Sequence, residues 1–138
     1  MAVQAAAKTP TEKRKASRDI WLRKHADYQR VYREGKRQSL PLMTYFFALR
    51  SQPISAQEIF EGPRVGLTAG KVLGNAVQRN RIKRRMREAV RLHCVELKAS
   101  VDVILHPRRT VLEAEFSQIE REVARAFRAV QARIASGI

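Results

Sequence analysis

The residues most able to do chemistry in this sequence are the cations between Gly74 and Val90. Their spacing repeats every four positions, which places them along one face of a helix. The cations that follow this spacing are Arg79, Lys83, Arg87 and Arg91. Like charges four residues apart repel each other and destabilise an isolated helix by a few tenths of a kcal/mol per pair. Guanidinium and ammonium groups bind phosphate well, so we expect this row to meet a polyanion.

The same segment has the signals of a stable helix. Asn75 is a good N-cap, and Gln78 stands at the position of its capping-box partner. The candidate core-facing stripe is Ile82, Met86, Ala89, His93 and Leu97. The exposed polar face is widened by Arg81 with Arg85 and by Asn80 with Arg84. The alternative interpretation is a basic face that is simply solvated.

The composition supports a polyanionic partner. The chain has 28 Lys and Arg against 13 Asp and Glu in 138 residues, a formal net charge of +15. Nucleic acid is the commonest partner of such a charge, and a membrane surface is the rival. No apolar run approaches the length of a transmembrane helix, and the N-terminus lacks the apolar region of a secretory signal. Cys94 is the only cysteine, which excludes a disulfide framework, so we expect a cytoplasmic protein.

Catalytic and metal-binding patterns are missing from the sequence. The histidines are scattered, without partners at metal-ligand spacing, and the chain has no Ser-His-Asp or Cys-His set. The candidates considered and set aside are His25, His93, His106, Asp19, Asp27 and Asp102. We therefore predict no catalytic residue and no metal ligand in this chain.

The patterns predict a small single-domain α+β protein, an α/β sandwich. Residues 1–17 are interpreted as a disordered basic arm and residues 18–138 as the domain. The order is α-β-β(-β)-α-β-α, with a possible extra strand between Gly35 and Leu42, and Gly35 as a helix stop. The expected helices are 22–34, 75–98 and 115–135, and an alternative start for the last is near Thr110. The expected strands are 42–49, 64–69 and 101–105, and residues 51–63 are expected to form a loop.

Aromatic residues form a second candidate surface. Tyr28 and Tyr32 lie four residues apart and share a helix face. In the strand 42–49, either Phe46 or the pair Tyr45 and Phe47 points toward the core, because side chains alternate. These rings could stack on unpaired bases, or they could be ordinary core residues.

The segment Gly74-Asn75-Ala76-Val77-x-Arg79-Asn80-Arg81-Ile82-Lys83-Arg84 resembles the RNR signature of the bacterial ribonuclease P protein. The segment Leu22-Arg23-Lys24-x-x-Asp27-Tyr28-x-x-Val31-Tyr32-x-x-Gly35 is similar to the first helix of that family. Arg64-Val65-Gly66-Leu67-Thr68 resembles the strand before the signature, and Asp102-Val103-Ile104-Leu105 with Arg108-Arg109 resembles the third strand and its exit. The family usually has phenylalanine at the positions of Tyr28 and Tyr32.

The resemblance implies the function. Members of this family join a catalytic RNA, which carries the chemistry with Mg²⁺, and together they remove the 5′ leader of precursor tRNA. The resemblance also implies a left-handed βαβ crossover. The alternatives are a general RNA-binding chaperone or ribosome-associated protein without a processing role, and a protein-only nuclease.

The implied sites are two. The expected contacts to the catalytic RNA on the RNR helix are Arg79, Asn80, Arg81, Lys83, Arg84 and Arg87. The expected leader-binding cleft, between the first helix and the sheet, contains Tyr28, Tyr32, Phe46, Arg37, Lys71, Arg108 and Arg109.

Overall fold

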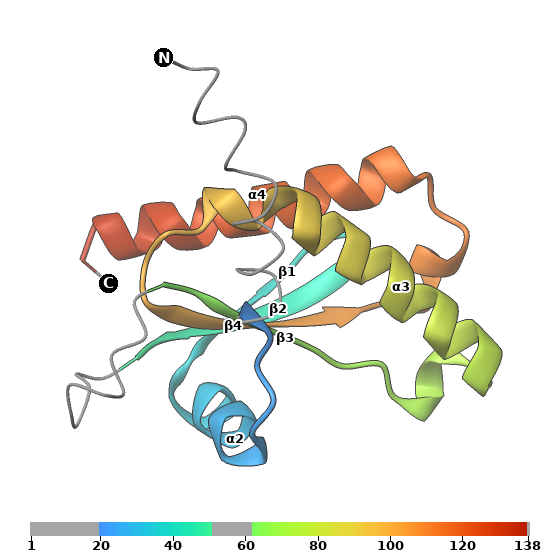
Figure 1. Ribbon diagram of the computed structural model, residues 1–138, viewed down its shortest axis with the longest axis horizontal. Helices are drawn as coiled ribbons and strands as arrows, with labels where there is room; N and C mark the ends of the chain where they lie inside the picture. The colour runs from blue at the N-terminus through green and yellow to red at the C-terminus, as the bar shows by residue number, and fades with distance from the viewer. Residues whose placement is uncertain (1–19, 51–61, 138) are drawn as a thin grey trace, which may run out of the picture.

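The computed structural model describes residues 20–50 and 62–137, which form an α+β sandwich (Figure 1). A four-stranded sheet lies between a two-helix layer and a single helix. Helices α3 (Ala76–His93) and α4 (Phe116–Ala135) cover one face, and α2 (His25–Glu34) lies on the other. The predicted arm 1–17 lies outside the described residues, as does the predicted loop over 51–63 except for its last two residues.

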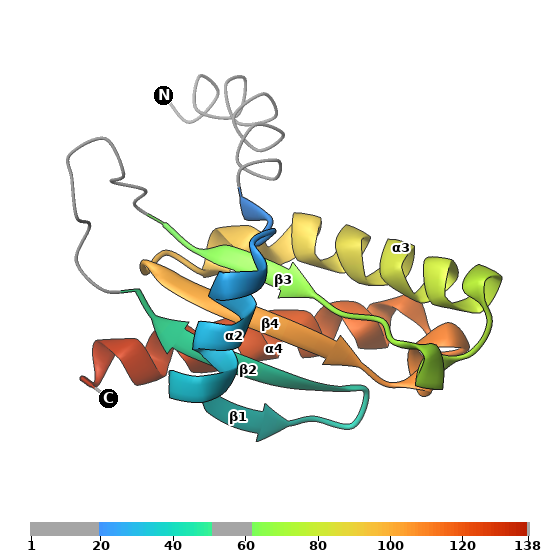
Figure 2. The same cartoon turned by 90° about the horizontal axis from the view of Figure 1, so that it is seen from below.

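The sheet has the order β1-β2-β4-β3, formed by β1 (Lys36–Ser39), β2 (Met43–Leu49), β4 (Val101–Pro107) and β3 (Arg64–Leu67). The possible extra strand after Gly35 is therefore real. β1 and β2 form a hairpin, β2 pairs antiparallel with β4, and β3 pairs parallel with β4. Figure 2 shows β3 and β4 running the same way with α3 behind the sheet, so the β3–α3–β4 crossover is left-handed. Nearly all such crossovers are right-handed.

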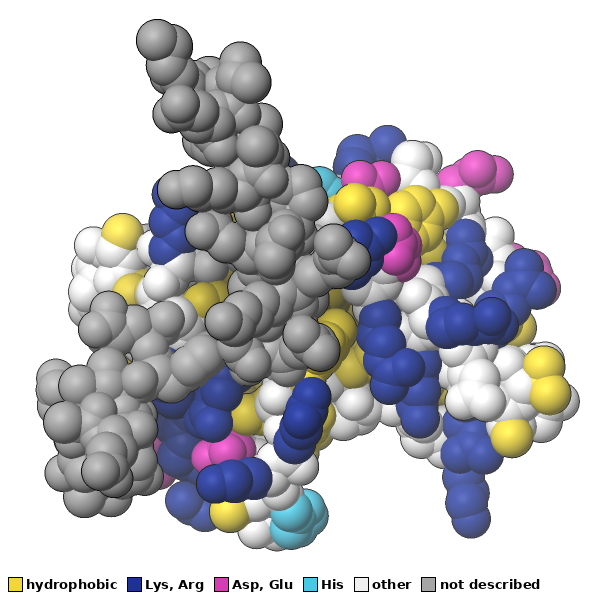
Figure 3. Space-filling view, viewed as in Figure 1, with side chains coloured by type: hydrophobic (Ala, Val, Ile, Leu, Met, Phe, Trp, Pro, Cys, Tyr) yellow, Lys and Arg dark blue, Asp and Glu magenta, His cyan; other side chains and the backbone are white. Residues whose placement is uncertain are grey.

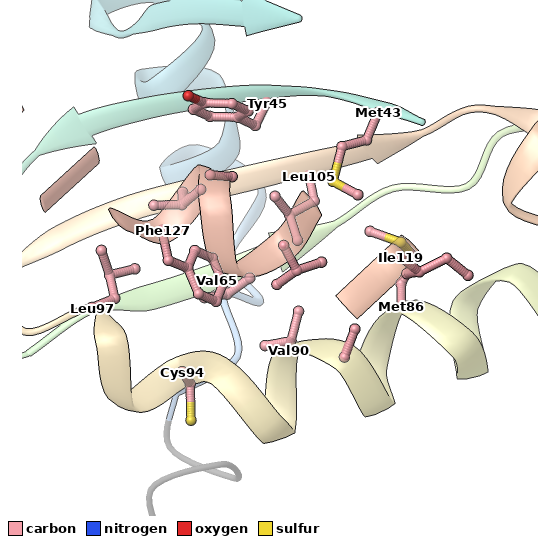
Figure 4. Close-up of a cluster of buried hydrophobic side chains, with 14 of the residues drawn as sticks. Met43, Tyr45, Val65, Met86, Val90, Cys94, Leu97, Leu105, Ile119 and Phe127 are labelled. Carbon is pink, nitrogen blue, oxygen red and sulfur yellow. The ribbon is translucent and has the colours of Figure 1, made fainter. Parts of the chain in front are cut away.

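The main core lies between the sheet and the two-helix layer. From β2 it receives Tyr45 and Phe47, which settles the parity of that strand, and Phe46 and Ala48 point to the opposite face toward α2. From the helices it receives Ile82, Met86, Ala89, Val90, Ile119, Val123, Phe127 and Val130, which confirms most of the predicted stripe on α3 (Figure 4). Half-buried His93 bonds Glu96 and Glu120 instead.

Several predicted boundaries are wrong by a few residues. Helix α2 begins at His25 rather than residue 22, because the Leu22 amide donates to the Val65 carbonyl, 2.8 Å away, and the chain there runs beside β3. Helix α3 ends at His93, and a 3₁₀ turn, η3 (Cys94–Glu96), follows. The stretch near Thr110 forms a separate 3₁₀ turn, η4 (Arg109–Leu112), so the later of the two predicted starts of α4 is the correct one.

Gly35 ends α2, as predicted. Its φ is −85°, an ordinary value for any residue. The glycine is needed because a Cβ there would lie 2.5 Å from the Val31 carbonyl oxygen and 2.6 Å from that of Phe47. The close approach lets the chain turn directly from α2 into β1.

A buried carboxylate fastens α2 to the sheet. The side chain of Asp102 on β4 is fully buried, and Arg30 Nη2 lies 2.6 Å from its Oδ2. Arg50 Nη1 lies 2.9 Å and Arg64 Nε 2.8 Å from Oδ1. The three arginines come from α2, from the residue after β2 and from β3. Asp102, isolated in the sequence, is thus the centre of an ion-pair network, which is how a buried charge becomes tolerable.

Candidate nucleic-acid interface

The basic helix face is the set of six RNR-helix residues predicted to bind RNA. The predicted capping box starts this helix: the Gln78 amide donates to Asn75 Oδ1, and the Asn75 amide donates to Gln78 Oε1, both at 2.9 Å. Four of the six side chains are exposed, and Arg79 and Lys83 are half-buried. None of the six side chains has a hydrogen bond or ion pair to another described residue; the six are Arg79, Asn80, Arg81, Lys83, Arg84 and Arg87.

Two other arginines of α3 are already engaged. Arg85 donates to the carbonyl oxygens of Val111, Leu112 and Ala114 at 2.8, 2.9 and 2.5 Å, which ties α3 to the connection before α4. Arg91 pairs with Glu88 at 2.5 Å, so the last cation of the predicted row is neutralised by its own helix. The uncompensated charge is therefore concentrated in the first three turns of α3.

Figure 3 shows how this charge is presented. Dark blue side chains gather over α3 on the right of the view, with few acidic side chains between them. Guanidinium groups that have no partner among the described residues keep their exposed donors for phosphate oxygens. The basic helix face is thus a ready binding surface for a nucleic-acid backbone.

The second surface lies on the α2 side of the sheet. Tyr32 and Phe46 meet edge to face, with ring centroids 5.1 Å apart and an interplanar angle of 83°. His106 on β4 lies 5.0 Å from Phe46 and 5.6 Å from Tyr32 by the same measure. We call Tyr32, Phe46 and His106 the ring cluster. The Tyr32 side chain is 41% exposed, so an unpaired base could reach its face.

Tyr28 has a different position from Tyr32. Its ring packs with the small core beneath α2, and its hydroxyl donates to the Leu22 carbonyl and accepts from the Leu67 amide, both at 3.2 Å. Gly66 leaves room for this ring, because a Cβ there would lie 2.8 Å from the Tyr28 hydroxyl. Tyr28 thus joins the start of α2 to β3, beside the ring cluster rather than within it.

The four cations predicted for the leader-binding cleft lie in two different places, two beside the ring cluster and two away from it. Arg37 on β1 is opposite Phe46 in the sheet register. Arg108 donates to Thr44 Oγ1 at 3.2 Å, and Thr44 is opposite His106. Both therefore border the ring cluster. Arg109 lines a separate hollow against η4 and α4 together with Leu42 and Gln118, among others, and Lys71 is exposed on the 3₁₀ turn η2 (Lys71–Leu73), without a contact to the rings.

His106 was missed by the sequence reasoning, which found no partner for it at metal-ligand or catalytic spacing. Its Nε2 lies 2.8 Å from the Tyr32 hydroxyl oxygen. Burial, with a smaller contribution from the Arg37 charge, lowers the pKa of the ring below its ordinary value. The only available signal was strand parity, which places residues 102, 104 and 106 on one face of β4.

Within residues 20–50 and 62–137, no cluster of three or more His, Cys, Asp or Glu residues is arranged to hold a metal ion. The helices of these same residues include none that is long and apolar enough to cross a membrane.

Comparison with known proteins decides which nucleic-acid binder this is. The family model described as ribonuclease P matches residues 16–131. The chain belongs to the ribonuclease P protein family. The ribonuclease P protein component of Brucella melitensis biotype 1 is 38% identical over 118 residues, covering 84% of this chain and 83% of the relative. That of Finegoldia magna is 33% identical over 103 residues, covering 75% and 83% respectively.

Solved structures agree with this assignment. The ribonuclease P protein of Staphylococcus aureus, determined at 2.0 Å, has a TM-score of 0.65 and 28% identity, covering 81% of this chain and 95% of that one. The ribonuclease P protein of Thermotoga maritima shares the fold, with a TM-score of 0.66 and 20% identity over 78% of this chain and 94% of that one. Family membership makes the chain the protein component of a ribonucleoprotein endoribonuclease of tRNA 5′-end processing, with an RNA partner. A general RNA chaperone is not favoured.

Proposed function

We propose that the two surfaces divide the work of a ribonuclease P protein. The basic helix face binds the catalytic RNA, and the ring cluster with its bordering arginines holds the single-stranded 5′ leader of precursor tRNA. The observation that carries this proposal is the separation of the cations without partners on α3 from the ring cluster, with its exposed Tyr32, on the far side of the sheet. Phosphate contacts suit a partner bound in one orientation, whereas stacking tolerates the varied sequences of leaders.

In this proposal the chain supplies binding and orientation. The catalytic RNA holds the Mg²⁺ ions and cleaves the phosphodiester bond, and the enzyme works in the cytoplasm. No side chain of this protein takes part in the bond-making step. The direct test is leader removal from precursor tRNA with the protein alone, with a bacterial ribonuclease P RNA alone and with both together. Cleavage by the protein alone would instead indicate a protein-only nuclease.

The leader role is now assigned chiefly to Tyr32 and Phe46. Tyr28 supports them from its bonds to Leu22 and Leu67, and Arg37 and Arg108 are placed to meet leader phosphates. Lys71 and Arg109 lie apart from the rings, and we propose that they contact RNA outside the stacked bases.

The strength of RNA binding should depend steeply on salt. Each phosphate that a cation neutralises releases counterions, so affinity falls as the salt concentration rises. Replacing Arg81 or Arg84 by alanine should reduce the slope of log K against log salt by roughly one if each meets one phosphate. Equilibrium binding to the catalytic RNA at several salt concentrations measures this. The matched control is Arg121→Ala on the exposed face of α4, because Arg85 bonds backbone carbonyls and cannot serve. An equal change in slope in this control would mean that overall charge, and not the basic helix face, sets the salt dependence.

Loss of the Tyr32 ring should weaken binding of precursor tRNA but not of mature tRNA. A base stack contributes about 1–3 kcal/mol, and the lower part of this range fits a ring that is 41% exposed. The measurement is the dissociation constant of the reconstituted enzyme for a precursor with a long leader and for one with none, comparing Tyr32→Ala with the native protein. Tyr28→Phe is the control, since it keeps the ring and should leave the leader preference intact. Equal losses for both RNAs would show that Tyr32 supports the fold and not the leader.

A further inference from the structure

The ring cluster contains one hydrogen bond whose direction can be argued. The Tyr32 hydroxyl oxygen and His106 Nε2 are 2.8 Å apart. A neutral imidazole has one nitrogen that donates and one that accepts. The phenol is the stronger acid of the two neutral groups, so its O–H donates and Nε2 accepts. The ring proton of His106 is then on Nδ1.

This bond determines where the Tyr32 ring lies. Tyr32 is near the exposed end of α2, and its edge-to-face contact with Phe46 alone would let the ring turn about its side-chain torsions. The bond to His106 fixes the far end of the ring at β4. One face of Tyr32 is thereby held for a ligand, at no cost in side-chain ordering when the ligand arrives.

The neutral state of His106 sets the direction of this bond. A protonated ring carries hydrogen on both nitrogens, so it can only donate to the Tyr32 hydroxyl oxygen. The charged or titratable groups that face His106 are Tyr32 from α2, Arg37 from β1 and Arg108 after β4, while β2 presents Thr44 and Phe46. Burial, with a smaller contribution from Tyr28, raises the pKa of Tyr32 further from neutral pH, and burial lowers the pKa of His106.

We propose that His106 is a positioning residue for leader recognition, which holds the Tyr32 ring in its stacking orientation by accepting the hydrogen of its hydroxyl. This rests on the proposed leader-binding role of the ring cluster. His106 acts on the leader through Tyr32, and the recognised group is an unpaired nucleobase rather than a phosphate. The hydrogen bond, the ring contacts and the burial all belong to described residues on α2, β2 and β4.

The test uses two variants that distinguish the hydrogen-bond acceptor of His106 from its aromatic ring. His106→Gln keeps an acceptor near the position of Nε2 without the ring, whereas His106→Phe keeps a ring without the acceptor. We expect His106→Phe to reduce the preference for leader-bearing precursor over leaderless tRNA by about two- to tenfold, the value of one neutral hydrogen bond, and His106→Gln to restore most of it. Tyr32→Phe should cause a similar loss, and adding it to His106→Phe should cause no further loss.

A pH series gives a second readout. The native preference should be constant between pH 7 and 8 and should change only below about 6.5, the ordinary histidine value, because the pKa of His106 is lowered and protonation reverses the bond to Tyr32 and adds a charge beside the rings. His106→Phe should show no such change. His93→Gln, a change of another half-buried histidine in the helical layer, is the matched control and should keep the native preference.

The outcomes are distinct. If the native enzyme shows no leader preference, the proposed function of the ring cluster fails, and this inference with it. If the native preference exists and His106→Phe retains it, only the role of His106 is overturned. A greater loss in His106→Gln than in His106→Phe would make His106 a stacking ring, and equal weakening of both RNAs with a lower Tm would make it a core residue; either result also overturns the positioning role.

Discussion

Replacing Asn80, Arg81 and Arg84 together by alanine should weaken assembly with the catalytic RNA by about a hundredfold to ten-thousandfold, since two charge-assisted contacts contribute about 3–6 kcal/mol. All three side chains are exposed, and none has a partner among the described residues. Alanine favours the helix, so the fold should persist. Arg79 is left in place because its Nε is buried, and its replacement could disturb the packing of α3.

The measurement is the dissociation constant for the catalytic RNA, with circular dichroism to verify the fold. The matched control is Arg121→Ala with Arg125→Ala, which removes the same two charges from the exposed face of α4. A loss in the control equal to that of the triple variant would mean that overall charge, rather than the basic helix face, binds the RNA. Normal assembly of a folded triple variant would remove this face from the interface.

Replacing Asp102 by asparagine should lower the free energy of unfolding by about 3–5 kcal/mol, the usual cost of removing one partner of a buried ion pair. The loss is large because Arg30, Arg50 and Arg64 would be left around an uncharged amide with only 18%, 13% and 24% of their side chains exposed. The free energy of unfolding of a native domain is about 5–15 kcal/mol in total, so the variant would lose much of its stability. Urea unfolding followed by circular dichroism measures it.

Asp27→Asn is the matched control for this second prediction. Asp27 makes the same kind of pair with Arg64, but at 3.3 Å and with 22% of its side chain exposed. This pair is longer and its carboxylate reaches solvent, so it stabilises the fold less than the fully buried Asp102, and the control should lose clearly less stability than Asp102→Asn. If both variants lost the same small amount, Asp102 would be a solvated ion pair and would not be what fastens α2 to the sheet.

The basic helix face could be predicted from the sequence because a helix is a local structure. Its N-cap, its apolar stripe and its row of cations all follow from residues within a few turns of each other. Local reasoning could not show that Arg85 and Arg91 are engaged within the protein while the neighbouring cations are not. Arg85 is engaged by carbonyl groups more than twenty residues away, and Arg91 by Glu88, a pairing that the row of cations concealed.

The resemblance to the family provided the left-handed crossover, which general rules would have predicted with the opposite hand. Its leader-cleft residues, by contrast, stay a proposal and are only partly brought together. Tyr32, Phe46, Arg37 and Arg108 gather on the α2 face, while Arg109 lines the hollow beside η4 and α4. Adjacent residues after a strand need not share a surface, which is why Arg108 and Arg109 separate.

By itself the sequence determined the family, the element order and the charged face of α3, because these depend on residue type and short-range periodicity. Only the tertiary structure decided that Phe46 faces α2, that Asp102 gathers three arginines and that His106 meets Tyr32. The packing of α2 on the sheet and the strand register together set these contacts. Packing brings Tyr32 of α2 to His106 of β4. The register of β2 and β4 determines which side chains face α2, and a slip by one position would turn them to the other face.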